Sequence, residues 1–167
     1  MYIVKQFNNN LIKNILLKMH KEPIFKIGNG GGKQMTGCYE LYSNKLSFLQ
    51  PLINFNSNVL KKYNLDYKNI FVENREFIFN KNDEPFDSIL HQDTFNDSGN
   101  KGCYTCVYYY YIDKTIKGGD LLFPPFGKYK PNQGDIIFFE GDMKHKISKL
   151  YGEGIRGILI TQFEKIN

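Results

Sequence analysis

The sequence contains no tryptophan and only three cysteines, Cys38, Cys103 and Cys106. Three is an odd number, and the first residues lack the basic segment followed by an apolar run that a secretory signal needs. We therefore expect a reducing compartment and place the protein in the cytoplasm. No stretch approaches the roughly 18 apolar residues of a membrane span, so we expect no membrane partner.

Arginine is equally scarce, because Arg75 and Arg156 are the only two in the chain. Lys and Arg number 22 against 17 Asp and Glu, and the resulting net charge of +5 favours acidic partners only weakly. A surface that reads nucleic acid through several guanidinium groups is not available. A solvated, lysine-rich surface is the simpler interpretation, and nucleic acid is not the partner that we expect.

The remaining composition is that of a globular protein with a substantial core. Of 167 residues, 41% are hydrophobic, and 14 Phe and 12 Tyr supply the aromatic bulk. This length fits one domain, and we predict a single unit over residues 1–167. Within it, we expect residues 1–66 to supply mainly helical support and a loop, and residues 67–167 to form a β core.

The N-terminal part shows helical periodicity twice. Apolar residues in 11–21 are spaced as in an amphipathic helix that ends before Pro23. Residues 43–64 predict one or two further helices, with Ser43 as an N-cap and Pro51 dividing the segment. Their expected role is to cover one face of a sheet.

A glycine-rich run between these helices, residues 28–37, could be mistaken for a phosphate-binding loop. It lacks the Gly-Lys-Ser/Thr ending of that motif. We interpret it as a flexible loop, with a possible role as a lid near a site.

From about residue 70 onward the sequence changes to short β-branched and aromatic runs separated by Gly, Pro, Asn and Asp. Such short strands with regular turn signals are typical of an all-β sandwich or barrel. With helices on the N-terminal side alone, the chain is predicted to be mainly β, in an α+β arrangement.

Two histidines and a carboxylate suggest a metal site. His91 and Asp93 are two residues apart near the end of a predicted strand, so both side chains point to one face. His145 follows 52 residues after Asp93 (145 − 93) at the start of another strand. Two histidines and one carboxylate form the facial triad of non-haem Fe(II) oxygenases, although the same set also binds Zn²⁺. The third histidine, His20, is interpreted as a solvated helix end.

Arg156 lies 11 residues after His145 (156 − 145), on the predicted strand GIRGILITQF. A permanently charged guanidinium inside an apolar strand is costly unless an anion meets it, and a dicarboxylate would provide a bidentate partner. An edge-strand arginine facing water or pairing with an aspartate is the alternative.

Taken in order, these motifs resemble the 2-oxoglutarate and Fe(II)-dependent dioxygenases, and among them the prolyl hydroxylase branch. The stretch CYTCVYY followed by Gly118 and Gly119 is especially similar to the hypoxia-sensing prolyl hydroxylases. The resemblance covers roughly residues 75–163 and rests on H-x-D at His91 and Asp93, CYTCVYYYYID from Cys103, GGDLLFP from Gly118, KPNQGDIIFF from Lys130, His145, and GIRG around Arg156.

The resemblance implies a double-stranded β-helix, a jelly-roll or cupin-like fold, with the N-terminal helices packed on its sheet. It implies Fe(II), 2-oxoglutarate and O₂ as cofactors, with ascorbate as an accessory reductant, and hydroxylation of an aliphatic C–H with succinate and CO₂ as co-products. By matching position, His91, Asp93 and His145 would ligate iron. Arg156 would bind the distal carboxylate of 2-oxoglutarate, and Tyr109 matches a tyrosine that hydrogen-bonds the same co-substrate.

Strand alternation adds independent detail. Cys103, Thr105, Val107 and Tyr109 share one face of their strand, and we expect it to point inward because a hydroxyl, an apolar wall and a phenol suit a dicarboxylate with an apolar middle. Leu121 joins this pocket by the resemblance. The odd spacing sends the thiols of Cys103 and Cys106 to opposite faces, so they are interpreted as packing residues.

Two positions depart from the family pattern. Ile160 stands where the hypoxia-sensing branch often has a hydroxyl-bearing residue, with Thr161 on the opposite face. A tyrosine expected on the strand before H-x-D has no clear counterpart, although Phe79 is nearby.

Three functions stay open at this point, and so does the oligomeric state. The first is a hydroxylase of a protein or peptide side chain, plausibly prolyl. The second is a nucleic-acid or nucleotide demethylase on the same scaffold, although GIRGILITQF lacks the second arginine that the repair demethylases carry. The third is a jelly-roll metal-binding protein without 2-oxoglutarate chemistry. Residues that select the substrate are expected in the N-terminal segment, the glycine-rich run and residues 94–102.

Overall fold

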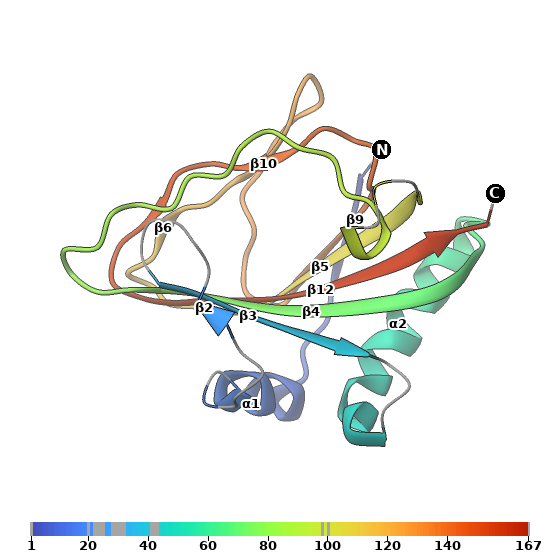
Figure 1. Cartoon of the computed structure of the whole chain (residues 1–167), viewed down its shortest axis with the longest axis horizontal. Coiled ribbons are helices and arrows are strands. Elements are labelled where there is room, and N and C mark those ends of the chain that lie inside the picture. Colours follow the sequence, from blue (N-terminus) through green and yellow to red (C-terminus); the bar gives the residue numbers. More distant parts are fainter. Residues whose placement is uncertain are drawn as a thin grey trace.

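A large antiparallel sheet forms the base of the fold (Figure 1). The computed structural model describes residues 2–19, 21, 26–27, 33–40, 44–97, 99 and 101–166. Within them the sheet has seven strands in the order β1-β9-β5-β12-β4-β3-β2. Their bounds are β1 Tyr2–Gln6, β9 Asp135–Glu140, β5 Cys103–Ile112, β12 Gly154–Lys165, β4 Tyr67–Phe79, β3 Lys33–Glu40 and β2 Lys26–Ile27.

A second layer of short strands lies over one face of this sheet (Figure 1). It consists of a three-stranded sheet, β10-β7-β8, and a β11-β6 pair. Their bounds are β6 Lys117–Gly118, β7 Leu121–Phe123, β8 Gly127–Tyr129, β10 Lys146–Ile147 and β11 Leu150–Tyr151. The two layers enclose an apolar cluster that includes Val107, Leu121, Ile137 and Ile158. This arrangement confirms the predicted double-stranded β-helix.

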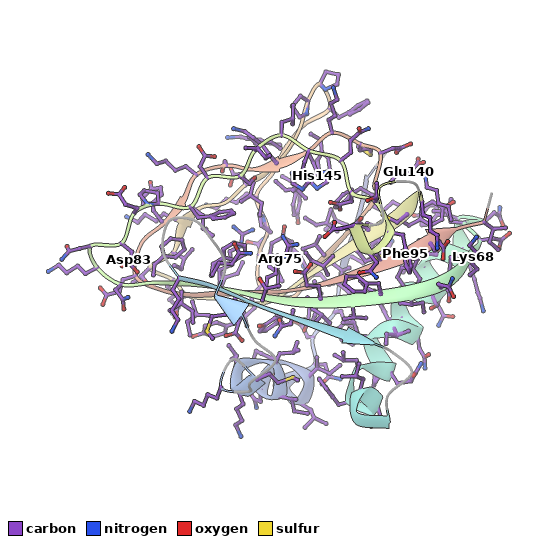
Figure 2. The ribbon with its side chains drawn as sticks, viewed as in Figure 1. Lys68, Arg75, Asp83, Phe95, Glu140 and His145 are labelled. Carbon is purple, nitrogen blue, oxygen red and sulfur yellow. The ribbon has the colours of Figure 1, made fainter. Side chains whose placement is uncertain are left out.

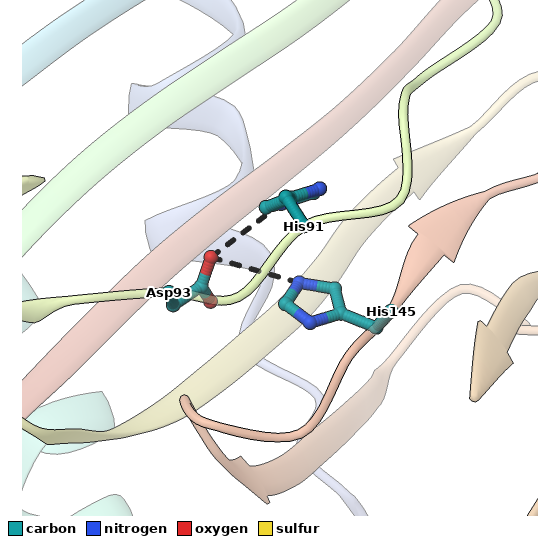
Figure 3. A group of neighbouring side chains, drawn as sticks. All are labelled: His91, Asp93 and His145. Atoms are coloured by element: carbon teal, nitrogen blue, oxygen red, sulfur yellow. Dashed lines mark ion pairs between the residues drawn. The ribbon is translucent and has the colours of Figure 1, made fainter. Parts of the chain in front are cut away.

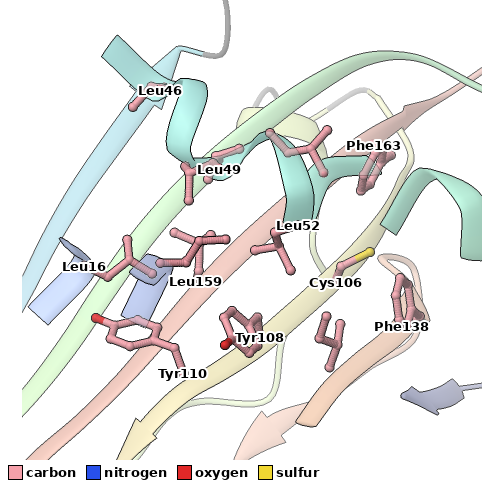
Figure 4. Packing of buried hydrophobic residues seen from close by; sticks show 14 of the residues in the cluster. Leu16, Leu46, Leu49, Leu52, Cys106, Tyr108, Tyr110, Phe138, Leu159 and Phe163 are labelled. Carbon is pink, nitrogen blue, oxygen red and sulfur yellow. The ribbon is translucent and has the colours of Figure 1, made fainter. Parts of the chain in front are cut away.

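Two helices cover the opposite face of the large sheet, α1 (Asn10–Met19) and α2 (Gln50–Lys62), the latter preceded by the 3-10 helix η1 (Asn44–Leu49). Leu16, Leu49 and Leu52 are fully buried against Tyr108 and Leu159 of the sheet (Figure 4). Full burial of each such leucine contributes about 1.5–3 kcal/mol to stability. The predicted packing of N-terminal helices on the sheet is confirmed.

The helical predictions hold for α1 and for the pair η1 and α2. Pro51 occupies the first turn of α2, where its missing N–H costs no hydrogen bond, so it separates the two helices as expected. His20, Pro23 and Ser43 lie outside the described residues. None of the described helices has the length and apolar character that crossing a membrane requires.

Strands occur where a loop and helical support were predicted. β3 pairs with β4 from Lys33 to Glu40, so the expectation of a flexible loop is wrong for residues 33–37, and residues 28–32 lie outside the described residues. β1 pairs with β9. Its Ile3 packs on the helix side and Val4 on the interior, which is the alternation of a strand. Residues 1–66 therefore also supply strands to the sheet, because pairing with a neighbouring strand outweighs weak local preferences.

The segment before His91 is less regular than predicted. We expected a strand at residues 88–93. Within this range the structure forms one bridge, between His91 and His145. The short 3-10 helix η2 (Phe95–Asp97) follows Asp93. A bridge is sufficient to bring the two histidines together, because paired residues of antiparallel strands lie side by side.

Candidate metal site and adjoining cavity

Three side chains converge between the two layers (Figure 3). His91, Asp93 and His145 each offer one atom suited to a metal, and these atoms lie within 4.8 Å of one another. Nε2 of His91 is 3.5 Å and Nε2 of His145 is 3.6 Å from Oδ1 of Asp93. The three residues predicted from the sequence as ligands are thus neighbours in the fold, and their arrangement could hold one metal ion.

The backbone fixes these three residues relative to one another. His91 N–H donates to the His145 carbonyl (2.9 Å) and His145 N–H to the His91 carbonyl (2.8 Å). Asp93 N–H donates to the Gly141 carbonyl (2.7 Å). A Cβ on Gly141 would lie 2.7 Å from the Asp93 carbonyl oxygen, so only glycine allows this approach.

Hydrogen bonds also set the orientation of each side chain. Nδ1 of His91 contacts the Ile89 carbonyl at 2.9 Å, and Nδ1 of His145 contacts the Met143 carbonyl at 2.8 Å. Because a carbonyl can only accept, Nδ1 of each ring carries a proton, and Nε2 of the neutral ring presents a lone pair; when His91 is protonated, its Nε2–H faces Asp93 instead. Thr105 Oγ1 donates to Oδ2 of Asp93 at 2.8 Å, which leaves Oδ1 toward the imidazoles.

The electrostatic balance favours the protonation states that a metal requires at Asp93 and His145, whereas at His91 it favours the protonated ring. Burial raises the pKa of Asp93, but the hydrogen bond from His91, the charge of His145 and the Thr105 hydroxyl outweigh it, so this pKa is lowered. Burial lowers the pKa of His145. The hydrogen bond with Asp93 raises the pKa of His91, whose side chain is 40% exposed. An ionised carboxylate and a neutral, buried imidazole are thereby favoured at neutral pH.

The triad lies in the wall of a cavity of about 520 Å³. Thr105, Val107, Tyr109 and Leu121 line the same cavity, so the predicted inward face of β5 is confirmed. Cys106, on the other face, packs in the helix-side cluster, and both Cys103 and Cys106 are free thiols. The cavity thus combines a polar end at the triad with apolar walls.

Arg156 is 2% exposed and lies next to Tyr109, with Cζ 5.0 Å from the centre of the phenol ring. Nη1 donates to the Gly119 carbonyl at 2.9 Å, whereas Nε and Nη2 find no acceptor among the described residues. Burial lowers the pKa of Arg156, and burial raises the pKa of Tyr109 against the opposing charge of Arg156. Two buried donors without partners are costly, and an anion would satisfy both.

Gly119 makes room for this arginine. It has a positive φ of +73°, and a Cβ at this position would lie 1.7 Å from Nη1 of Arg156. Gly118 and Gly119 both have positive φ, which allows the chain to turn sharply here. The turn therefore also creates the space that the buried guanidinium occupies.

Several cavity residues were not singled out from the sequence. Arg75 and Glu73, two apart on β4, form a bidentate ion pair (2.9 and 2.8 Å) on the cavity wall. Arg75 projects to the side of the large sheet on which His145 lies (Figure 2). The one available signal was that Arg75 is one of only two arginines.

The departures from the family pattern have clear positions. Ile160 lines the cavity, while Thr161 is 1% exposed on the opposite face. Phe77 lines the cavity, whereas Phe79 is buried in the interior cluster next to it. Of residues 94–102, Asp97 borders the cavity.

Comparison with known proteins identifies relatives by structure and not by sequence. No protein-family model matches the chain, and no curated protein sequence matches it. A Trichoplax adhaerens prolyl hydroxylase, solved with a hypoxia-inducible factor peptide, superposes with a TM-score of 0.74 at 13% identity over 98% of this chain and 83% of that one. The collagen prolyl hydroxylase of Paramecium bursaria Chlorella virus-1, solved with 2-oxoglutarate, gives 0.70 at 17% identity over 99% and 96%.

A Pseudomonas putida prolyl-4-hydroxylase gives a TM-score of 0.69 at 12% identity over 99% of this chain and 92% of that one. These coverages mean that the whole chain, with its helices and both strand layers, corresponds to nearly the whole of these structures. The resemblance predicted from the ordered motifs is thus confirmed for the fold.

Proposed function

We propose that this chain is a 2-oxoglutarate- and Fe(II)-dependent dioxygenase that hydroxylates an aliphatic C–H of a protein or peptide side chain, with proline as the target residue. The observation that carries the proposal is the convergence of His91, Asp93 and His145 at one end of a cavity whose other end has Tyr109 backed by the buried Arg156. Two histidines and one carboxylate leave open positions on a six-coordinate ion for a chelating co-substrate and O₂.

The donor set fits Fe(II). Nε2 of His91, Oδ1 of Asp93 and Nε2 of His145 would hold the ion, and the second atom of each group is already bonded to a carbonyl or to Thr105. Such outer partners fix the orientation of the ligands before the metal arrives. His145 is shielded from water by Phe139, whose ring centre lies 4.7 Å from that of the imidazole.

The remaining cavity residues fit 2-oxoglutarate. Arg156 would donate Nε and Nη2 to the distal carboxylate, with the Tyr109 hydroxyl beside it. Val107 and Leu121 would pack against the methylene groups. When bound, Fe(II) with 2-oxoglutarate and O₂ supplies the oxidising power that hydroxylates the substrate and yields succinate and CO₂.

A peptide substrate fits the exposed side of the triad. His91 is the exposed ligand, and Asp87, Ser88 and Gln92 of its segment line the cavity together with the Glu73–Arg75 pair. Hydroxyl, amide and charged groups can bind a peptide backbone. The prolyl hydroxylase structures support a prolyl target, and one of them is solved with a peptide.

Turnover assays test this proposal. Purified protein, loaded anaerobically with Fe(II), is given 2-oxoglutarate, O₂ and proline-containing peptides, and succinate is measured together with the addition of one oxygen atom to the peptide. We expect both products in equal amounts, and neither with an Asp93→Ala variant. Turnover of methylated nucleic acid but of no peptide would overturn the substrate class. Stoichiometric zinc without any decarboxylation of 2-oxoglutarate would overturn the enzymology.

A further inference from the structure

A second cavity, of about 430 Å³, is bordered by Arg156, which does not line the cavity of the triad. Its charged lining consists of Lys114, Lys117, Lys130 and Arg156, and the rest of the wall is formed by isoleucine, proline and glycine. No acidic residue belongs to this lining among the described residues. Four positive charges around one hollow repel one another and attract anions.

The three lysines are not neutralised by their surroundings. Over the ranges that the structure describes, none of them has a carboxylate within the 4.0 Å of an ion pair, although other lysines of the chain do. The two nearby acids are engaged elsewhere. Asp113 accepts hydrogen bonds from the Tyr111 hydroxyl (3.0 Å) and from the Ile155 N–H (2.8 Å), and Asp120 pairs with Lys128 (3.7 Å).

Arg156 adds a buried guanidinium to the wall of this cavity, and it has more N–H donors than the distal carboxylate of 2-oxoglutarate can use. Its side chain is 2% exposed and borders this cavity, and its Nε and Nη2 atoms have no acceptor within the described part of the chain. A guanidinium offers five N–H donors in a planar fork. One carboxylate cannot use all five, so the group can serve a ligand on either side.

We propose that the lysine-lined cavity binds a small oxyanion with two or more negative charges, of the phosphate or polycarboxylate type. Lys114, Lys117 and Lys130 supply point charges, and Arg156 supplies directed hydrogen bonds at the inner end. If the proposed function holds, the same guanidinium also meets the keto diacid, so occupation of the second cavity changes the affinity for 2-oxoglutarate. Reciprocity requires 2-oxoglutarate to change the affinity for the anion by the same factor.

Calorimetric titration of the metal-free protein tests the site without any dependence on catalysis. Pyrophosphate and citrate are titrated separately, with acetate at equal ionic strength as the singly charged control. The test variant is Lys114→Gln/Lys117→Gln/Lys130→Gln. The matched control is Lys18→Gln/Lys61→Gln/Lys62→Gln, which removes the same charge from the exposed surfaces of α1 and α2.

We expect one saturable site for pyrophosphate, citrate or both, an affinity loss of about tenfold or more in the test variant, and less than about threefold in the control. The relative strength of the two anions identifies the ligand type. No saturable binding, equal loss in both variants, or unchanged binding in the test variant would overturn the proposal. It would also be overturned if 2-oxoglutarate displaced the anion in simple competition, because the hollow would then be the end of the co-substrate pocket. A failed titration leaves the turnover assay, and so the proposed function, untouched.

Discussion

The two ends of the main cavity differ in how far they are completed by the protein itself. At the triad, every atom that does not face the candidate metal is bonded to a carbonyl or to Thr105. At the other end, Tyr109 lines the cavity, and the buried guanidinium of Arg156 next to its ring keeps two nitrogens without acceptors in the described residues. One end is oriented before any ligand arrives, whereas the other is completed only by an anion. Under the proposed function, the difference predicts that the metal can bind before 2-oxoglutarate, and that 2-oxoglutarate gains much of its affinity from relieving an unsatisfied charge.

We expect the largest effect on metal affinity at the triad, the end of the cavity that the protein completes by itself. Asp93→Ala removes the carboxylate that faces both imidazoles, so Fe(II) affinity should fall by more than about 100-fold, beyond the range for loss of an outer partner. Anaerobic metal titration measures this affinity. Asp97→Ala, which changes another acid of the cavity wall, should retain Fe(II) binding within about threefold. Equal losses in both variants would contradict the assignment of the metal to the triad.

A second substitution changes the other end, where Arg156 has two nitrogens without acceptors in the described residues. Arg156→Met removes the buried charge at similar volume, so 2-oxoglutarate affinity should fall by about 100-fold or more while Fe(II) affinity stays unchanged. Without ligand, the free energy of unfolding should change by less than about 1.5 kcal/mol, because relief of the unpaired charge offsets the lost bond to Gly119. Calorimetry and denaturant unfolding measure the two quantities.

The matched control for that substitution is Arg75→Met, which removes the other arginine of the chain, one that is already paired with Glu73. Its 2-oxoglutarate affinity should stay within about fivefold of the unchanged protein. Similar losses in both variants would show that general positive charge, and not the buried guanidinium, attracts the diacid.

A smaller effect on metal affinity is expected when a residue that orients a metal ligand, here Thr105, is changed. Thr105→Val preserves shape but removes the hydrogen bond to Asp93, so metal affinity should fall by about 10-fold to 100-fold. Thr161→Val is the control, since this buried threonine lies on the opposite face of the sheet. A loss in the control as large as in Thr105→Val would mean that the effect reflects packing and not ligand orientation.

The smallest expected effect concerns pH in the metal-free protein. The raised pKa of His91, due first to its bond with Asp93, stabilises the fold below about 6.5, and this contribution is lost as pH rises through the folded pKa. Burial lowers the pKa of His145, so its contribution has the opposite sign and destabilises the fold as pH falls below 6.5. The two contributions oppose each other. Nuclear magnetic resonance of the rings should show His91 taking up a proton at higher pH than His145, and the reverse order would contradict these environments.

The order of motifs was sufficient to predict the β-helix and the three residues that meet at the candidate metal site. H-x-D and the distal histidine carry a local signal, because strand alternation puts side chains two apart on one face. The same alternation puts Thr105, Val107 and Tyr109 on one face but leaves open whether that face is inward; their side-chain chemistry led us to expect it inward, and they do line the cavity. Phe77 and the Glu73–Arg75 pair could not be assigned to the interior, since the alternation of β4 does not say which face meets the other layer.

The weaker predictions failed where structure depends on distant neighbours. β3 has little local strand signal and is formed by pairing with β4, whereas β1 contains the strand-favouring run Tyr2-Ile3-Val4, which is too short to interpret without its partner β9. The strand predicted before His91 is reduced to one bridge, because its partner segment contributes a single residue, His145. The second cavity brings Lys114, Lys117 and Lys130 together with Arg156, a grouping that composition does not reveal.

A crystal structure of protein prepared anaerobically with Fe(II) and 2-oxoglutarate tests the central claim most directly. We expect one ion bound by Nε2 of His91, Oδ1 of Asp93 and Nε2 of His145. We expect the distal carboxylate of 2-oxoglutarate to accept hydrogen bonds from Nε and Nη2 of Arg156. An ion held elsewhere, or a diacid that leaves Arg156 without an acceptor, would contradict that claim.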